Sequence, residues 1–317
     1  MSTDTRTNPN PNSTPQTSDP GQAANSVREV ERIIGAHRQR EGGGFVVRRP
    51  VPSLGLEQVD PFLLIDEMGP VDYAPGEAIG APDHPHRGFE TVTYVLDGEM
   101  EHEDSAGHRG ALRAGDVQWM TAGAGIVHSE MPSRRILEQG GRVHGFQIWI
   151  NLPARLKMTQ PRYQEIPAAG IPTAETSDGA ARVRVIAGEA LGARAVIDTH
   201  TPIVYQDWSL NPGADVTVPL RPDQRALAYV FQGAARIGDG RREVRDGQLA
   251  VLGPGAAVRL VGADQPGRLL LLAGVPLNEP LARYGPFVMN SEAEIMQAVR
   301  DFQNGRLGEI TRTAALK

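Results

Sequence analysis

The segments Tyr94-Val-Leu-Asp-Gly98 and Tyr229-Val-Phe-Gln-Gly233 are two versions of one pattern, 135 residues apart. Each is followed by a glycine at the start of an apolar run, Gly115 in the first copy and Gly247 in the second, and then by a glycine-rich turn. A repeat of this length indicates duplicated domains rather than a solenoid. We therefore expect two copies of one unit.

Short apolar or alternating runs, broken by glycine and proline, surround both segments. Such runs are typical of strands joined by tight turns. The predicted strands of the first half are Pro61–Ile65, Phe89–Leu96, Asp116–Met120 and Phe146–Ile150. Those of the second half are Arg182–Ile186, Ile203–Leu210, Leu227–Phe231, Gln248–Leu252 and Arg268–Leu272. The pattern predicts an all-β fold.

Changes in composition along the chain suggest where its domains begin and end. Residues 1–27 are rich in Ser, Thr, Asn, Pro and Gln, a composition that favours a disordered tail. We expect a first domain over 28–165 and a polar linker over 166–180. A second domain is expected over 181–289.

The end of the chain carries a helix signature within residues 290–309. Ser291-Glu-Ala-Glu294 forms a capping box, and apolar residues follow at helical spacing before a glycine that offers a stop. The apolar stripe is expected to dock on one of the sheets. Its members are Ile295, Val299 and Phe302, and the stop is Gly305.

The composition narrows the kinds of site and partner that the chain can have. Its 317 residues include no cysteine, which excludes disulfides, zinc fingers and iron–sulfur clusters. Any metal must be held by His, Asp or Glu. The net charge of −6 argues against direct nucleic-acid binding, and no segment is typical of a signal peptide or membrane span. We therefore expect a cytoplasmic protein with no direct nucleic-acid or membrane partner.

Two short motifs of the first half combine into a candidate metal site. His84-Pro-His86 places two imidazoles on one face of a strand, because strand side chains alternate with period 2. His128-Ser-Glu130 repeats this spacing with an imidazole and a carboxylate. Two strands facing each other across a small barrel would offer all four side chains to one point. Such a set suits Fe(II), Mn, Co, Ni, Cu or Zn.

The carboxylate ligand has an alternative. Glu90 has the same parity as His84 and His86, so on an unbroken strand it would also face the site. Glu130 is preferred because it shares a strand face with His128. The other histidines are expected to have no metal role: His102 and His108 in a solvated hairpin, and His37, His144 and His200 in structural positions.

The second copy of the repeat serves as an internal control for the metal site. Counting from the repeated tyrosine places Pro219 and Arg221 at the positions of His84 and His86. Counting from the last turn glycine places Val258 and Leu260 at the positions of His128 and Glu130. No ligand type remains in the second copy, so we expect a single metal site in the first.

Four longer motifs closely resemble the pirin family of the cupin superfamily. They are Asp83-His-Pro-His-Arg-Gly-Phe-Glu-Thr91, Gln118-Trp-Met-Thr-Ala-Gly123, Val127-His-Ser-Glu-Met-Pro132 and Tyr284-Gly-Pro-Phe-Val-Met-Asn290. The resemblance implies a bicupin: two antiparallel β-barrel (jelly-roll) domains, with a metal in the N-terminal one alone. It also implies one divalent ion per chain, with Fe(II) the expected metal, on His84, His86, His128 and Glu130.

The resemblance implies two kinds of function. Members of the family resemble quercetin 2,3-dioxygenases, which cleave flavonols with O2 and release carbon monoxide; Glu130 would then be both ligand and catalytic base. Phe89, Trp119 and Met120 could line a pocket for a small, flat, enolisable aromatic substrate, or could belong to the barrel core. The alternative function is that of an iron-binding, redox-sensing regulatory protein, similar to a transcriptional co-regulator, that acts through a protein partner.

Overall fold

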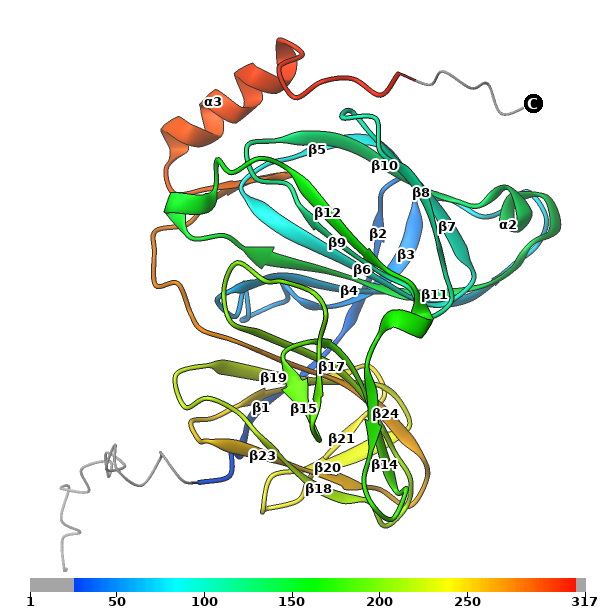
Figure 1. Cartoon of the computed structure of the whole chain (residues 1–317), viewed down its shortest axis with the longest axis vertical. Coiled ribbons are helices and arrows are strands. Elements are labelled where there is room, and N and C mark those ends of the chain that lie inside the picture. The colour runs from blue at the N-terminus through cyan, green and yellow to red at the C-terminus, as the bar shows by residue number, and fades with distance from the viewer. Residues whose placement is uncertain (1–25, 312–317) are drawn as a thin grey trace, which may run out of the picture.

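The structure is a computed structural model that describes residues 26–311. All but two residues of the predicted N-terminal tail, 1–27, lie outside this range. The described chain forms two β-barrels, and each barrel consists of a seven-stranded and a four-stranded antiparallel sheet (Figure 1). The predicted all-β bicupin architecture is confirmed.

The first barrel contains strands β2 to β12. Its seven-stranded sheet has the order β12 (Arg162–Ile166), β9 (Val117–Thr121), β6 (Phe89–Asp97), β11 (Gly141–Asn151), β4 (Phe62–Tyr73), β3 (Phe45–Val51) and β2 (His37–Glu41). Its four-stranded sheet has the order β5 (Ala81–His86), β10 (Ile126–Pro132), β7 (Glu99–Asp104) and β8 (Arg109–Arg113). A short helix, α2 (Arg134–Gln139), connects β10 to β11.

The second barrel repeats this arrangement. Its seven-stranded sheet has the order β1 (Val30–Gly35), β22 (Gln248–Leu252), β19 (Arg225–Gln232), β24 (Gly267–Gly274), β17 (Ile203–Leu210), β14 (Ala181–Ala187) and β13 (Thr173–Glu175). Its four-stranded sheet has the order β18 (Asp215–Pro219), β23 (Ala257–Gly262), β20 (Ala234–Ile237) and β21 (Arg242–Arg245). The smaller elements are the hairpins β15 (Glu189–Ala190) with β16 (Ala193–Arg194) and β25 (Ala282–Tyr284) with β26 (Phe287–Met289), and the 3-10 turns η1 (Ala154–Leu156) and η2 (Ala168–Gly170).

Two edge strands belong to a different part of the fold from the one that the expected domain boundaries give them. Strand β1 lies in the stretch assigned to the first domain, yet it pairs with β22 of the second barrel. It takes there the edge position that β12 takes beside β9 in the first barrel. The side chain of Arg28 is 1% exposed and donates to the carbonyls of Gly253, Arg221 and Gln224. Strand β13, inside the expected linker, extends the second sheet.

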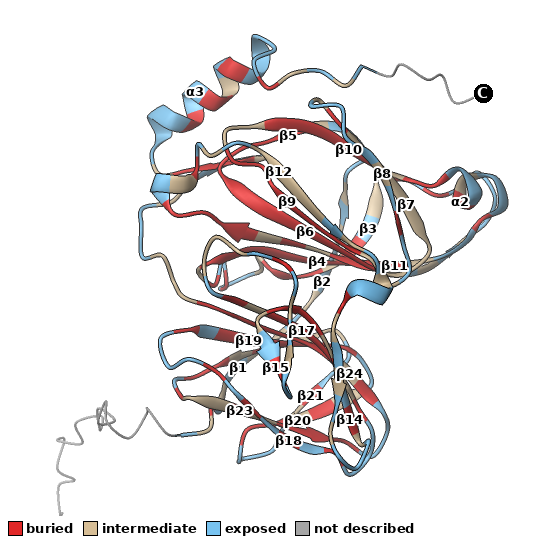
Figure 2. Ribbon diagram, in the orientation of Figure 1, coloured by how far each residue is buried: buried red, intermediate tan, exposed pale blue. Residues whose placement is uncertain are grey.

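The two barrels share one hydrophobic core. The outer faces of the two seven-stranded sheets meet, and buried residues from both sides form a single cluster (Figure 2). This cluster includes Val92, Trp119 and Ile148 from the first barrel, and Leu227 and Leu270 from the second. Because apolar burial is the main favourable term in folding, we expect the barrels to be held as one unit.

The C-terminal helix α3 (Glu292–Gln303) begins where the capping box predicts. The Ser291 side chain accepts a hydrogen bond from the backbone N–H of Glu294 at 3.3 Å. The helix packs on the β25–β26 hairpin beside the first barrel. Ile295 is buried, whereas Phe302 is 41% exposed and contacts β26 only at its edge, with its ring 6.4 Å from that of Phe287. Among the described residues, no helix is long and apolar enough to cross a membrane.

Candidate metal centre

Three histidines of the first barrel converge on one point. His84 lies on β5 and is the direct antiparallel partner of His128 on β10, and His86 lies two residues further along β5. One ring nitrogen from each of the three lies within 4.8 Å of the others. The two strands are hydrogen-bonded neighbours in one sheet, so the predicted placement on strands facing each other across the barrel is wrong.

The surroundings of His86 and His128 favour neutral imidazoles. Both side chains are buried. Burial lowers the pKa of each ring well below its ordinary value, and the neighbouring histidines lower it further. A neutral imidazole presents the lone pair that a divalent metal needs.

The hydrogen bonds of the three rings also fit a metal. Both ring nitrogens of His128 are buried without a hydrogen-bond partner, which is unfavourable in a folded protein. His84 Nδ1 contacts the Pro82 carbonyl oxygen at 2.7 Å, and His84 Nε2 lies 3.0 Å from His86 Nε2. The contact with the Pro82 carbonyl fixes the His84 ring and leaves its Nε2 available as a metal ligand. The site therefore fits a divalent cation bound by three histidines.

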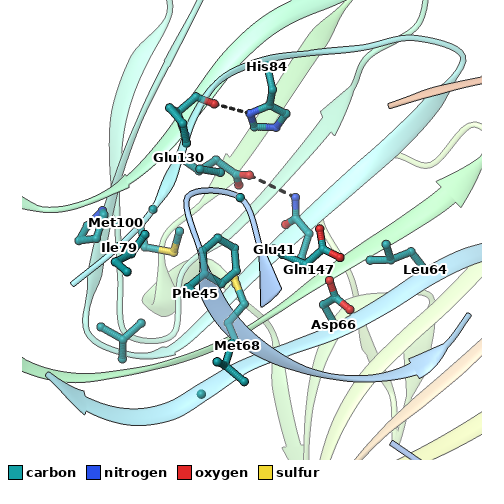
Figure 3. A pocket seen from close by; sticks show the side chains of 18 of the residues that line it. Glu41, Phe45, Leu64, Asp66, Met68, Ile79, His84, Met100, Glu130 and Gln147 are labelled. Atoms are coloured by element: carbon teal, nitrogen blue, oxygen red, sulfur yellow. Dashed lines mark hydrogen bonds between the residues drawn. The ribbon is translucent and has the colours of Figure 1, made fainter. Parts of the chain in front are cut away.

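Glu130 lies beside the histidines but outside the group whose ligand atoms converge. Its carboxylate accepts hydrogen bonds from Thr93 Oγ1 at 2.9 Å and from Gln147 Nε2 at 3.3 Å. These donors come from β6 and β11 of the opposite sheet. Glu130 lies between His84 and Gln147 on the wall of a cavity (Figure 3), so its carboxylate and the histidine cluster share one space.

Glu90, the alternative ligand, faces away from this space. Gly88 has a φ of +89° and interrupts the strand between His86 and Glu90, so the parity expected for an unbroken strand does not hold. Glu90 and Thr93 lie on opposite faces of β6 because side chains alternate. The Glu90 carboxylate accepts a hydrogen bond from Thr121 at 2.7 Å, and burial raises its pKa to about 7.

The cavity next to the histidines has a volume of about 520 Å³. Its apolar wall includes Phe45, Leu64, Met68, Ile79, Met100 and Trp149. Its polar wall includes Glu41, Arg49, Asp66, Glu130, Gln147 and Arg283. An apolar cavity with a few convergent polar groups is typical of a small-molecule site.

The three aromatic or apolar residues expected to line a pocket lie elsewhere. Phe89, Trp119 and Met120 are fully buried, and none of them lines the 520 Å³ cavity. Trp119 belongs to the core between the barrels, because it is on the outer face of its sheet. Phe89 packs against a candidate ligand, with its ring 5.1 Å from that of His86. The apolar wall comes instead from other residues, among them Leu64 of β4 and Trp149 of β11.

His102 is buried inside the first barrel, and its predicted position in solvent is wrong. It was expected in a solvated hairpin, but it is 3% exposed and lies directly opposite Glu130 in the pairing of β7 with β10. Its ring stacks on Tyr163 and forms an ion-pair contact with Glu165. His102 and Asp104 have the same parity on β7, and this alternation is the signal that could have placed both inside the barrel.

The second barrel contains no equivalent polar cluster among the described residues. Val218 is the strand partner of Val258, just as His84 is the partner of His128. The position of His84 therefore corresponds to Val218, not to Pro219 as the residue count suggested. Val218, Val258 and Leu260 are buried in an apolar cluster, so this barrel has a hydrophobic interior.

Two antiparallel barrels with a three-histidine group in the first define a bicupin with one candidate metal centre. The chain belongs to the pirin family. It matches the family Pirin over residues 44–150 and the Pirin C-terminal cupin domain over residues 205–308.

Relatives of known structure or name share both the sequence and the fold. Human pirin is 42% identical over 287 residues, which cover 89% of this chain and 95% of that protein. The crystal structure of quercetin 2,3-dioxygenase from Acinetobacter baumannii is 39% identical with a TM-score of 0.84, covering 90% of this chain and 100% of that chain. A bacterial pirin from Escherichia coli in complex with nickel(II) shares the fold at 21% identity, with a TM-score of 0.60, covering 77% and 99% of the two chains.

Proposed function

We propose that this protein is a metal-dependent dioxygenase that cleaves flavonols with O2 and releases carbon monoxide. The observation that carries the proposal is the group of three histidines with ring nitrogens within 4.8 Å of one another, beside a 520 Å³ cavity that also contains Glu130. The likeness to the Acinetobacter baumannii quercetin 2,3-dioxygenase supports the choice of substrate.

In this proposal His84, His86, His128 and Glu130 hold one divalent ion, with Fe(II) the expected metal. The bound ion supplies the Lewis-acid and redox chemistry that the reaction of a phenolic substrate with O2 requires. Three neutral rings and one carboxylate leave coordination positions open. The protein contributes the positions of the four side chains and a largely apolar cavity beside them.

Glu130 has the second role in this proposal, that of general base. A flavonol must lose the proton of its 3-hydroxyl group before its central ring becomes electron-rich enough to react. Glu130 would accept this proton as the substrate enters, since its carboxylate faces the cavity. The hydrogen bonds from Thr93 and Gln147 hold the carboxylate in one orientation, as proton transfer requires. The apolar wall binds the rings of the substrate and excludes water.

The proposal is tested on protein purified without added metal. Metal analysis identifies the native ion, and the same sample is then assayed in an oxygen electrode with quercetin while carbon monoxide is measured. We expect oxygen uptake and carbon monoxide release in equal amounts. The variant His128→Ala, which lacks one histidine, should lose both the ion and the activity. An iron-loaded protein that leaves a panel of flavonols unchanged would contradict the proposal.

A further inference from the structure

The segment after the second barrel returns to the metal-binding barrel. From β24 the chain runs back along the molecule, and the β25–β26 hairpin lies against the first barrel below α3 (Figure 1). The hairpin is fixed next to the metal site, because the backbone N–H of Val288 donates to the Arg87 carbonyl at 3.0 Å, and Arg87 directly follows His86. Residues of the hairpin therefore form part of the cavity wall.

Arg283 of β25 is the charged residue that this hairpin brings to the cavity. Its guanidinium lies over the ring of Trp149, 5.0 Å from the centroid. The Trp149 ring in turn lies 5.1 Å from the ring of His86. All three residues line the cavity. A positive charge is therefore placed one aromatic ring away from the candidate metal centre.

The guanidinium of Arg283 forms no ion pair with a carboxylate of the described residues, although the charges of Glu41 and Asp66 act on it across the same cavity. Among residues 26–311, its one hydrogen bond is from Nη1 to the Leu63 carbonyl at 3.3 Å, and no ion pair includes it. The other arginine of the cavity, Arg49, is paired with Asp66 and with Glu41. A partly buried guanidinium with unused donors is costly unless an anionic group pairs with it. A ligand that brings an anionic oxygen would compensate this charge.

We propose that Arg283 is the anion-recognition residue of the cavity. Its planar set of donors binds the oxyanion of a flat aromatic ligand, a phenolate or an enolate, and orients the ligand toward the histidines. Charge-assisted hydrogen bonds of this kind are stronger than neutral ones, and arginine suits a flat, delocalised anion better than lysine does. The identity of the ligand rests on the proposed function, whereas the assignment of Arg283 rests on the cavity itself.

Tyr284 provides a matched control on the same strand. It is the next residue along β25 and is 68% exposed, and it does not line the cavity. The variants to compare are Arg283→Gln, Arg283→Lys and Tyr284→Phe, each loaded with Zn(II), which has no redox chemistry. The probes are 3-hydroxyflavone and flavone, which share one ring system and differ in the acidic hydroxyl. Dissociation constants are measured by quenching of tryptophan fluorescence, and circular dichroism shows that each variant is folded.

We expect Arg283→Gln to weaken binding of 3-hydroxyflavone roughly 10-fold or more and to leave binding of flavone unchanged. Arg283→Lys keeps the charge and should lie between the wild type and Arg283→Gln, and Tyr284→Phe should match the wild type. An equal loss for both probes, or no loss for 3-hydroxyflavone, would overturn the assignment. Should Arg283→Gln fail to fold, the Arg283→Lys variant decides by the same comparison of the two probes.

Oxygen uptake by the iron-loaded wild type separates this assignment from the proposed function. Suppose that Arg283→Gln selectively loses 3-hydroxyflavone binding while the iron-loaded wild type takes up no oxygen. This result would contradict the proposed dioxygenase function and support the anion-recognition role of Arg283. Oxygen uptake with equal KM and kcat in the wild type and in Arg283→Gln would overturn the role of Arg283 and leave the dioxygenase intact.

Discussion

Glu130 and Glu90 are two buried carboxylates of the first barrel with different surroundings. Glu130 faces the cavity and accepts hydrogen bonds from Thr93 and Gln147. Glu90 faces the junction with the second barrel, where the ring of His200 lies 4.0 Å from its carboxylate. Spacing along the chain could not separate the two, because the interruption at Gly88 exchanges the faces on which later residues lie.

The two carboxylates give a direct test of the metal-ligand assignment. We expect Glu130→Ala to lose most of the bound metal, with the affinity falling roughly 100-fold or more, since removal of even an outer hydrogen-bond partner of a ligand costs about 10- to 100-fold. Glu90→Ala should retain the metal and serves as the matched control. The metal content of both purified variants is measured after dialysis. Retained metal in Glu130→Ala would defeat the assignment.

The raised pKa of Glu90 predicts a pH-dependent effect on stability. Burial raises the pKa of its carboxyl from 4.5 to about 7, so the native state binds this proton more tightly than the unfolded chain does. The wild-type free energy of unfolding therefore falls as pH rises from about 4.5 to about 7. Glu90→Gln removes this loss and can still accept the hydrogen bond from Thr121. We expect the variant to gain about 1–3 kcal/mol over the wild type at pH 8 relative to pH 4.

Urea denaturation at the two pH values measures this gain. The other groups that act on Glu90 are Trp119 of β9, Arg162 and Asp198, together with His200 in the loop before β17. Thr121→Val removes the hydrogen bond to Glu90 but leaves the carboxyl in place, so it should keep the pH dependence. The same difference between Glu90→Gln and the wild type at pH 4 and pH 8 would contradict the prediction.

Among the elements, the β25–β26 hairpin depends most on contacts made by other parts of the chain. A Cβ at Gly88 would come within 1.9 Å of the Val288 carbonyl oxygen, so this close approach of the hairpin requires glycine. Lys157 is 1% exposed and donates from Nζ to the carbonyls of Gly88 at 2.8 Å and Val288 at 3.1 Å, and to Asn151 Oδ1 at 2.6 Å. One side chain thus joins the turn after His86, the end of β11 and the hairpin.

Replacing this lysine should loosen the hairpin. Lys157→Met leaves three buried acceptors without a donor, so we expect the free energy of unfolding to fall by roughly 2–4 kcal/mol. The amide of Val288 should also exchange its hydrogen faster, because local opening becomes easier. Met158→Ala, at an exposed neighbouring position, is the control and should change neither property. Wild-type stability in Lys157→Met would show that the lysine does not hold these elements together.

At the scale of the whole molecule, reciprocal hydrogen bonds join the two copies of the repeat. Tyr94 donates its hydroxyl hydrogen bond to Asp207 of the second barrel at 2.7 Å. Tyr229, its counterpart, donates to Glu67 of the first barrel at 2.6 Å. Each carboxylate is also paired with an arginine of its own barrel, at 2.6 Å in both cases. The junction is therefore reciprocal, with each repeated tyrosine bonded to the other copy.

This reciprocity predicts similar effects for the two tyrosines. Tyr94→Phe and Tyr229→Phe each remove a buried hydrogen bond to a charged group, so we expect each to lower the free energy of unfolding by about 1–3 kcal/mol. Neither residue contacts the histidines, and the metal content should stay that of the wild type. Urea denaturation and metal analysis test both points, with the exposed Tyr284→Phe as control. A loss in only one of the two variants would show that the junction is not reciprocal.

Much of the fold could be predicted from local pattern. Alternation and turn residues marked the strands, and Ile203–Leu210 and Gln248–Leu252 have the predicted bounds. The pairing partners of a strand lie far away in the sequence. The pairing of β1 with β22 of the second barrel was therefore not predicted. Distant strand pairing also explains why Val218, and not Pro219, is the counterpart of His84. It explains as well why His102 is buried.

The duplicated β architecture, the family and the candidate histidines could be predicted from the sequence alone. These histidines are His84, His86 and His128. These features follow from short-range spacing, because residues two apart on a strand share a face wherever that strand lies. Tertiary structure decided which side chains join the histidines around the cavity. Strand pairing placed Thr93 and Gln147 on Glu130 and turned Glu90 outward, and the returning hairpin brought Arg283, because such contacts depend on which distant segments the fold brings together.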